Sequence, residues 1–337
     1  MENIKIQDVG EQGLLKRLQK FCPAEIIGDD AAVMATSAGK CLVVTTDVLV
    51  DGVHFSDATT SPEDAGWRGV AANLSDLAAM GATPLGITVG LGVRGDISVS
   101  WVEKLYEGMA ECLQEYQTVI VGGDVVRSQI VTISITAFGE ASPDRIIRRS
   151  TAKVGDAIVV TGFHGASRAG LELLLHPELG RNLSDAEKNA LIKSHQRPKP
   201  RLDILPVIFD IFNSQLPIHD SSFPISGMDS SDGLADAVVQ ICTMSGLGAR
   251  IDGKKLPIPP SLNKLVSLEK AIEWVLYGGE DFELVLCLPL EAAEELVKKL
   301  GEGAAIVGRI TNDTDVRLVD GDGNDKILSL SRGFQHF

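Results

Sequence analysis

Short apolar runs alternate along the chain with stretches in which apolar residues recur every three or four positions. Residues 41–50 are β-branched and apolar, which predicts a buried strand. Residues 62–80 carry apolar side chains at helical spacing, and Ser61 before them is a typical N-cap. Gly81 ends the run, as glycine commonly does at a helix C-terminus. The pattern therefore predicts a strand, a loop and an amphipathic helix in that order.

The same alternation continues through both halves of the chain. Further strands are predicted at residues 86–93, 118–121, 130–138 and 157–161. A helix is expected to begin at Ser100, which has a glutamate three residues later and so matches a capping box. Because strands and helices interleave, the fold class is α/β or α+β.

Two polar segments interrupt this alternation. A length of 337 residues suggests about two domains, and residues 140–150 are polar and basic just before a new apolar strand. We place the domain boundary there, which gives domains of residues 1–145 and 146–337. Residues 176–201 are rich in Pro, Lys and Arg and predict a second surface connection.

Charge and cysteine content exclude several function classes. The chain has 31 Lys and Arg against 46 Asp and Glu, a net charge of −15, which disfavours nucleic-acid binding. No basic and apolar leader and no run of about 20 apolar residues is present, so we expect a cytoplasmic protein that does not enter a membrane. The five cysteines form no C-x-x-C pair and are expected to be buried and reduced.

Six short segments each place a carboxylate among small residues next to an apolar run. Small neighbours let a ligand approach the backbone, and clustered carboxylates repel one another unless a cation lies between them. Oxygen ligands of this kind suit Mg²⁺, which is usually shared with substrate phosphates. The segments therefore predict a Mg²⁺–polyphosphate ligand, and they lie at residues 28–31, 45–47, 73–76, 122–124, 229–233 and 278–281.

Each segment also has a simpler interpretation as a turn or a helix cap, because Asp and Gly are common there. For Asp76 the alternative is a solvated helix face, although Asp is a poor helix former and Asn73 shares that face. Other nucleotide motifs fit less well. Gly90, Gly92 and Gly95 match G-x-G-x-x-G, but the next helix begins too late for a dinucleotide site. No P-loop or protein-kinase motif is present, so an ATP site would be of another kind.

Taken together, the segments resemble a known family. GDDAAV, TTDVLVDGVHF, NLSDLAAMGATPLG, VGGDVVRS, RSTAKVGD, DSSDGLADA and YGGEDFELV occur in this order in the thiamine-monophosphate kinases. The resemblance runs from about residue 28 to the C-terminus. NLSDLAAMGA, GGD and SDGL are shared with the wider aminoimidazole ribonucleotide synthetase superfamily, whereas TTDVLVDGVHF and GGEDFEL are more specific to the kinases.

The resemblance implies a two-domain aminoimidazole ribonucleotide synthetase-like fold. Residues 1–145 would bind ATP and magnesium and would form a barrel with the same sheet of a second copy, giving a homodimer. Residues 146–337 would form an α+β domain that closes over ATP and the substrate. The implied partners are ATP and thiamine monophosphate.

The resemblance also implies roles for individual residues. Several Mg²⁺ ions would be held by Asp30, Thr45, Thr46, Asp47, Asp76, Asp124, Asp229 and Asp232. ATP would be contacted by Gly123, Asp124, Arg149 and Ser231. Thiamine monophosphate would be contacted by His54, Glu280 and Phe334. Catalysis would depend most on Asp47, Asp124, Arg149 and Asp232.

The expected reaction is direct in-line transfer of the ATP γ-phosphoryl group to the acceptor phosphate. A phosphate monoester is largely deprotonated at neutral pH, so no general base is required. The obstacle is repulsion between two polyanions, which metal ions and an arginine would reduce. The alternatives are another ATP-dependent enzyme of the superfamily, a metal-dependent phosphatase and a nucleotide-binding protein without catalysis.

Overall fold

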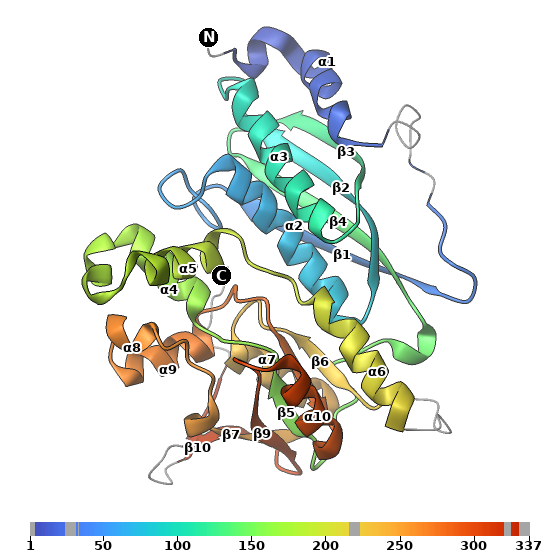
Figure 1. Ribbon diagram of the computed structural model, residues 1–337. Coiled ribbons are helices and arrows are strands. Elements are labelled where there is room, and N and C mark those ends of the chain that lie inside the picture. Colours follow the sequence, from blue (N-terminus) through green and yellow to red (C-terminus); the bar gives the residue numbers. More distant parts are fainter. Residues whose placement is uncertain (1–3, 24–31, 33, 216–222, 320–324, 330–337) are drawn as a thin grey trace. The chain divides into compact units, whose positions relative to one another are not determined.

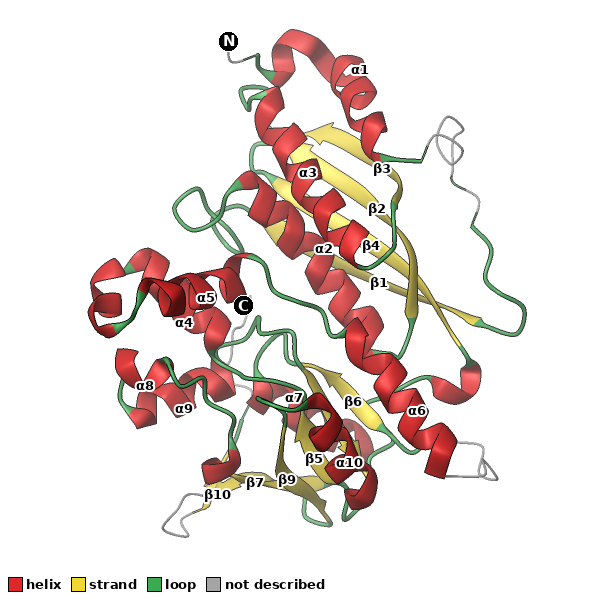
Figure 2. Cartoon of the chain, in the orientation of Figure 1, coloured by secondary structure: helices red, strands yellow, loops and turns green. Residues whose placement is uncertain are grey.

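A computed structural model of the chain describes residues 4–23, 32, 34–215, 223–319 and 325–329 (Figures 1 and 2). The helices are α1 Ile6–Leu18, α2 Pro62–Ala79, α3 Val99–Glu115, α4 Ala166–Leu175, α5 Asp185–Gln196, α6 Leu205–Gln215, α7 Leu234–Ser245, α8 Leu262–Leu265, α9 Leu268–Tyr277 and α10 Leu290–Leu300. The strands are β1 Cys41–Val50, β2 Thr83–Val93, β3 Ile120–Arg127, β4 Thr132–Ala141, β5 Ala157–Val160, β6 Ser226–Asp229, β7 Gly248–Asp252, β8 Leu284–Leu288, β9 Ala305–Thr311, β10 Val316–Val319 and β11 Asp325–Ile327.

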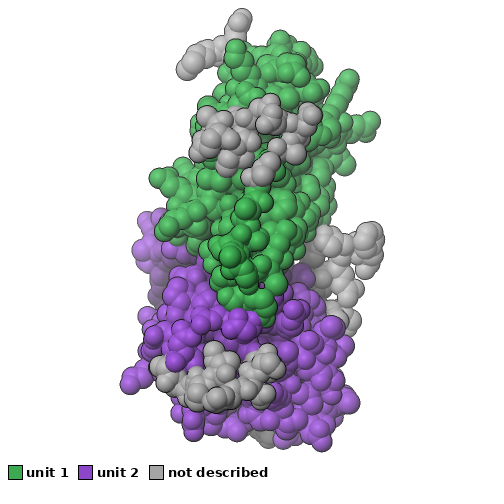
Figure 3. Space-filling model, turned by 90° about the vertical axis from the view of Figure 1, so that its right-hand side faces the viewer, with its two compact units in different colours: residues 1–77, 82–143 green, residues 78–81, 144–337 purple. Residues whose placement is uncertain are grey.

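The chain forms two compact units (Figure 3). The first contains residues 1–77 and 82–143, and the second contains residues 78–81 and 144–337. The first has a four-stranded sheet and the second a seven-stranded sheet, so the mixed α/β class is confirmed. Among the described residues, no helix combines the length and the apolar character needed to cross a bilayer.

The sheet of the first unit has the order β1-β4-β2-β3. Strands β1, β4 and β2 pair antiparallel, and β2 pairs parallel with β3, so β1 and β3 form the two edges. Helices α2 and α3 cover one face (Figure 1), where Leu49, Ile133 and Ile135 are buried. Alternate β1 side chains point away from these helices, and Leu42 and Val44 remain 54% and 51% exposed.

Two glycines bring α2 and α3 together. A Cβ atom at Gly66 would lie 2.0 Å from the Leu105 carbonyl oxygen, and one at Gly108 would lie 1.8 Å from the Glu63 carbonyl oxygen. Both contacts are with backbone, which a side-chain rotation cannot relieve. The crossing of the two helices therefore requires glycine on each of them.

The seven-stranded sheet of the second unit has the order β11-β10-β7-β9-β5-β8-β6 and mixes parallel and antiparallel pairs. Strands β5 and β8 are buried along their whole length, which explains their continuous apolar sequences. Ile158 and Cys287 pack in a cluster with α7, whereas Val159 and Leu286 pack with α6 and α10. A separate cluster around Trp274 joins α4, α5, α8 and α9.

The structure confirms the predicted strand at 41–50 and the helix that follows it, but three local predictions are wrong. Ser98, not Ser100, caps α3, because its Oγ accepts from the Trp101 N–H at 3.1 Å. The strand predicted to end before the GGD segment continues through it to Arg127, since β2 pairs along its length. The connection predicted at 176–201 contains helix α5.

The expectation that all cysteines are buried is also wrong in part. Each of the five is free, as expected, and Cys112, Cys242 and Cys287 are buried. Cys41 is exposed at the first residue of the edge strand β1.

The glycine crossing leads to a first prediction. Replacing Gly108 by alanine should lower the free energy of unfolding by about 3 kcal/mol, because α3 must move away from the Glu63 carbonyl. Denaturant unfolding followed by the fluorescence of Trp67 and Trp101, which lie in α2 and α3, measures the change. Gly69→Ala is the control: its Cβ would meet side chains and no backbone, the nearest atom being the end of Ile135 at 3.1 Å. Equal stability of the two variants would contradict the prediction.

Candidate active site

Polar side chains of α2 bond to the edge strand β1. The Thr45 hydroxyl donates to Asp76 Oδ2, and the Asp47 N–H donates to Asn73 Oδ1 at 3.2 Å. Asn73 is fully buried, and its Nδ2 donates to the Gly69 carbonyl at 2.9 Å. This face of the helix lies against the sheet, so the alternative of a solvated helix face for Asp76 is wrong.

Thr46 lies on the other face of β1. Its hydroxyl is 2.9 Å from that of Thr136 on β4, and either oxygen can donate. Thr45 and Thr46 therefore point to opposite faces, as consecutive strand residues do. A single cation bound between β1 and α2 would meet Thr45 directly, whereas Thr46 belongs to the open face of the sheet.

Gly123 and Asp124 lie on the opposite edge strand, β3. A Cβ atom at Gly123 would be 2.2 Å from the Val89 carbonyl oxygen, so close pairing with β2 requires glycine here. Asp124 is exposed, and its Oδ1 accepts from the Val125 N–H at 2.9 Å. Two strands separate β3 from β1, a distance of about 14 Å. The first unit thus brings Thr45 and Asp76 together but does not bring Asp124 to them.

His54 follows β1 in a turn with several bonds. Its ring Nδ1 accepts from the Val50 N–H at 3.0 Å, and the backbone N–H of His54 donates to the Val50 carbonyl at 2.9 Å. The buried Arg68 of α2 donates to the His54 carbonyl at 3.3 Å. Because Nδ1 is an acceptor, the neutral ring carries its proton on Nε2.

In the second unit, two of the acidic segments lie against one another. Strand β6 ends at Asp229, which is 2% exposed and accepts from the Ser231 hydroxyl at 3.0 Å. The Glu280 N–H donates to the Ser231 carbonyl at 2.7 Å. A Cβ atom at Gly279 would lie 2.7 Å from the same carbonyl, which explains the glycine before Glu280. The structure therefore brings Asp229, Ser231 and Glu280 together.

The loop that carries Glu280 has an unusual backbone. Glu280 and Phe282 have φ angles of 58° and 52°, a left-handed conformation that costs a non-glycine residue about 1–3 kcal/mol. Between them, Asp281 accepts from the Gly165 and Ser167 N–H groups at 2.7 and 2.9 Å, at the start of α4. Burial raises the pKa of Asp281 to about 7, although these bonds oppose the shift. The bonds hold the strained loop in place.

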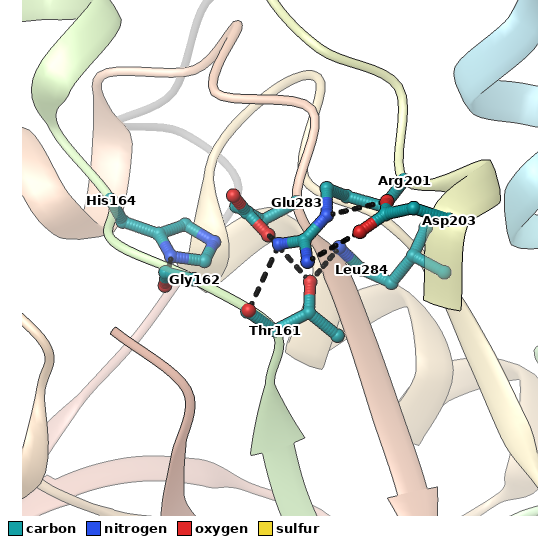
Figure 4. Close-up of polar contacts among 7 residues, drawn as sticks. All are labelled: Thr161, Gly162, His164, Arg201, Asp203, Glu283 and Leu284. Atoms are coloured by element: carbon teal, nitrogen blue, oxygen red, sulfur yellow. Dashed lines mark hydrogen bonds and ion pairs between the residues drawn. The ribbon is translucent and has the colours of Figure 1, made fainter. Parts of the chain in front are cut away.

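A second anchor follows at Glu283 (Figure 4). Its carboxylate pairs with Arg201 and accepts from the Thr161 hydroxyl at 2.6 Å. Arg201 also donates to the Thr161 carbonyl at 2.9 Å, and the Thr161 hydroxyl accepts from the Leu284 N–H at 2.8 Å. Burial raises the pKa of Glu283, while Arg201 opposes the shift. This buried network fixes the start of β8 next to the end of β5.

Arg149 is exposed and runs along α7. Its Nη1 donates to Gln240 Oε1 at 2.6 Å, and Gln240 Nε2 donates to Asp236 Oδ2 at 2.6 Å. The Arg149 carbonyl accepts from the hydroxyls of Ser226 and Ser245 at 3.0 and 2.9 Å. The backbone of Arg149 is thus fixed, while its guanidinium has exposed donors that a phosphate could use.

The remaining predicted residues are only partly placed. Asp30 and Phe334 lie outside the described residues, and Asp232 is exposed just before α7. Across the described part of the chain, no three His, Cys, Asp or Glu side chains gather closely enough to hold a metal ion. Thr45 and Asp76 still present a hydroxyl and a carboxylate side by side, and these are hard oxygen donors of the kind Mg²⁺ binds.

Comparison with known proteins places this arrangement in a family. The AIR synthase related protein N-terminal and C-terminal domain models match residues 28–141 and 153–321. The thiamine-monophosphate kinase of Synechococcus elongatus is 49% identical over 337 residues, covering 100% of this chain and 99% of that protein. The chain belongs to the thiamine-monophosphate kinases.

Two solved structures of thiamine-monophosphate kinases support the same assignment. The crystal structure from Stenotrophomonas maltophilia K279a is 30% identical with a TM-score of 0.76, covering 94% of this chain and 96% of that one. A structure of AaThiL complexed with AMPPCP and TMP is 31% identical with a TM-score of 0.73, covering 100% of both chains. The two-domain fold implied by the sequence is therefore confirmed.

The sequence alone does not point to the residues that support the Glu280 loop. Ser167, His195 and Arg201 carry no motif, and each lies more than 80 residues from Glu280 or Glu283 along the chain. The sequence marks Asp281 only as part of an acidic segment. Its hydrogen bonds from the Gly165 and Ser167 N–H groups appear only in the structure. Two features of the sequence mark the ends of helices that can contact a loop. Ser167 lies near the start of one helix, and Pro198 follows the end of another.

His164, next to the Gly165 whose N–H bonds to Asp281, gives a second prediction. The ring is fully buried beside the Gly162 carbonyl, and burial lowers its pKa from 6.5 to about 4. Between these two pH values the imidazole is protonated in the unfolded chain but neutral in the folded chain. The free energy of unfolding therefore decreases by about 3 kcal/mol as the pH falls from about 6.5 to 4. His164→Asn should remove this part of the pH dependence in denaturant unfolding.

The control for that measurement is His176→Asn, because His176 is exposed. The same substitution at this exposed position shows how much of any change in slope comes from replacing a histidine by asparagine in general. An unaltered slope in His164→Asn would show that the buried ring does not titrate in this range.

Proposed function

We propose that this protein transfers the γ-phosphoryl group of ATP to thiamine monophosphate and forms thiamine diphosphate. The observation that carries the proposal is the 49% identity to a thiamine-monophosphate kinase over the whole chain. A related structure complexed with AMPPCP, an analogue of ATP, and TMP supports the two substrates. A cytoplasmic location belongs to the same proposal and is supported by the five free cysteines.

The proposed roles of the two units follow the predicted ones. Residues 1–145 bind ATP and magnesium, and residues 146–337 close over ATP and the substrate. Gly123 and Ser231 contact ATP, and the exposed guanidinium of Arg149 adds charged donors to its phosphates. His54, Glu280 and Phe334 contact thiamine monophosphate.

We assign the magnesium ligands to the carboxylates and hydroxyls named from the sequence. The donor set fits, because Thr45 and Asp76 are in contact and Asp229 lies 3.0 Å from the Ser231 hydroxyl at a strand end. Bound Mg²⁺ would neutralise the phosphates and the charge that develops between them. Asp47, fixed by its backbone bond to Asn73, and Asp232 complete this set with Asp30, Thr46 and Asp124.

The strand order supports the proposal of a second copy. Asp124 lies on the edge opposite Asp47, and the open face between these edges exposes Leu42, Val44 and Val48. We propose that edge β1 of one copy meets edge β3 of another, which closes the two sheets into a barrel without free edges. Asp124 of the partner subunit would then lie beside Asp47.

The activity itself is tested with the purified full chain. Incubation with ATP, Mg²⁺ and thiamine monophosphate should give thiamine diphosphate and ADP in equal amounts, measured by chromatography. Free thiamine, an aminoimidazole precursor and selenide serve as alternative acceptors and should give no product. Phosphate release from thiamine monophosphate without ATP would support a phosphatase, and nucleotide binding without any turnover would support a regulatory protein.

Asp47→Asn should lower kcat by at least about 100-fold, because the neutral amide is a weaker ligand for Mg²⁺. Steady-state kinetics over a range of Mg²⁺ concentrations measure the effect. Asp57→Asn, an exposed residue of the loop after β1, is the matched control and should retain wild-type turnover. Near-wild-type kcat for Asp47→Asn at saturating Mg²⁺ would remove Asp47 from the ligand set.

A mixed dimer tests whether the site is shared. Asp47→Asn and Asp124→Asn homodimers should both be nearly inactive, but a heterodimer purified through two different tags has one site with both native carboxylates. It should regain about half of the wild-type activity. A heterodimer of two differently tagged Asp47→Asn chains is the control. If the first heterodimer is as inactive as the control, each site takes both carboxylates from one chain.

A further inference from the structure

Glu280 has a buried histidine beside its carboxylate. His195 Nδ1 lies 3.7 Å from Glu280 Oε2, and the same nitrogen lies 3.2 Å from the Ser167 hydroxyl. The His195 side chain is 4% exposed, whereas that of Glu280 is 35% exposed. The carboxylate of Glu280 is therefore reachable from solvent on one side and faces a buried polar pair on the other.

The histidine is held by two closely packed helices. His195 lies in the last turn of α5, and Ser167 lies in the first turn of α4. A Cβ atom at Gly170 of α4 would lie 2.1 Å from the Leu191 carbonyl oxygen and 2.9 Å from His195 Cβ. This close approach leaves the His195 ring little freedom to move relative to Ser167.

The backbone of the Glu280 loop is fixed to the same helix. The Ser167 N–H donates to Asp281 Oδ1 at 2.9 Å, so α4 holds the residue next to Glu280. Glu280 itself is left-handed, with a φ angle of 58°. The loop backbone is thus fixed at Asp281. A further contact is required to hold the long side chain of Glu280 in a single rotamer.

We propose that His195 is a positioning residue, which together with Ser167 directs the Glu280 carboxylate toward thiamine monophosphate. The inference rests on the proposed substrate role of Glu280 and adds a residue that no sequence motif marks. His195 acts through Glu280 and does not touch the reacting phosphates. Its loss should weaken binding of the acceptor substrate and leave ATP binding and the phosphoryl transfer step nearly unchanged.

The test is a kinetic comparison of full-length variants with both substrates varied. His195→Phe keeps a ring but removes the polar nitrogen, and it should raise the KM for thiamine monophosphate about 10-fold while the KM for ATP and kcat change less than about 2-fold. His195→Asn keeps a donor at the position of Nδ1 and should restore most of the affinity. His176→Phe is the matched control, because His176 lies 3.8 Å from Glu178 in a similar but exposed pair.

Glu280→Gln separates this inference from the proposed function. If Glu280→Gln leaves the KM for thiamine monophosphate unchanged, the proposed substrate role of Glu280 is wrong. If it raises this KM and His195→Phe does not, the role of Glu280 stands and the positioning role of His195 is wrong. The double variant should match Glu280→Gln alone, since His195 acts through that carboxylate; additive effects would overturn the inference.

Folding is checked by thermal unfolding of every variant. If His195→Phe is unstable, Ser167→Ala replaces it, because this change removes only the hydroxyl that holds the ring. It should raise the KM for thiamine monophosphate about 3-fold with the KM for ATP unchanged, since one hydrogen bond to the ring is lost. A wild-type KM for thiamine monophosphate in a folded Ser167→Ala protein would overturn the proposal.

Discussion

The first unit depends on a polar contact inside an otherwise apolar helix-to-sheet interface. Burying an amide or a carboxylate without a partner costs several kcal/mol, so such groups persist only where hydrogen bonds satisfy them. Asn73 meets this condition with the Gly69 carbonyl and the Asp47 N–H, and Asp76 with the Thr45 hydroxyl. These bonds fix β1 against α2 and hold the acidic residues of an edge strand in defined positions.

The second unit places its candidate site residues on turns. Two turns, one after β6 and one before β8, stabilise each other through the bond from the Glu280 N–H to the Ser231 carbonyl. The left-handed backbone at Glu280 and Phe282 is unfavourable by itself. Asp281 accepts a hydrogen bond from the Ser167 N–H at the start of α4, and Glu283 pairs with Arg201. These bonds compensate for the strain. Because the backbone is held on both sides of Glu280, this residue would lose little conformational entropy when a substrate binds.

Sheet order separates residues that are proposed to form one site. The first sheet leaves β1 and β3 as free edges and exposes apolar side chains on the face between them. Free edges and an apolar face favour association with another sheet. The same order separates Asp47 from Asp124, so the need to cover the sheet and the need to complete the acidic site lead to the same proposed assembly.

The sequence determined the features that depend on neighbouring residues. The strand at 41–50 and the helix after it follow from periodicity, and Asp76 stands out within that helix because helix propensity disfavours aspartate. The motifs of the kinase family could also be recognised, because each consists of residues adjacent in sequence. Ser98 and Ser100 are both suitable N-caps, and only the backbone geometry before α3 distinguished them.

The tertiary structure decided everything that depends on residues distant in sequence. The position of Asp124 follows from strand order, and the contact of His195 with Ser167 and Glu280 follows from the packing of α4 against α5. Local patterns contain no information about such pairings, because the same strands and helices could form other sheet orders with equal local energies. Burial and hydrogen bonding between distant segments select one of them.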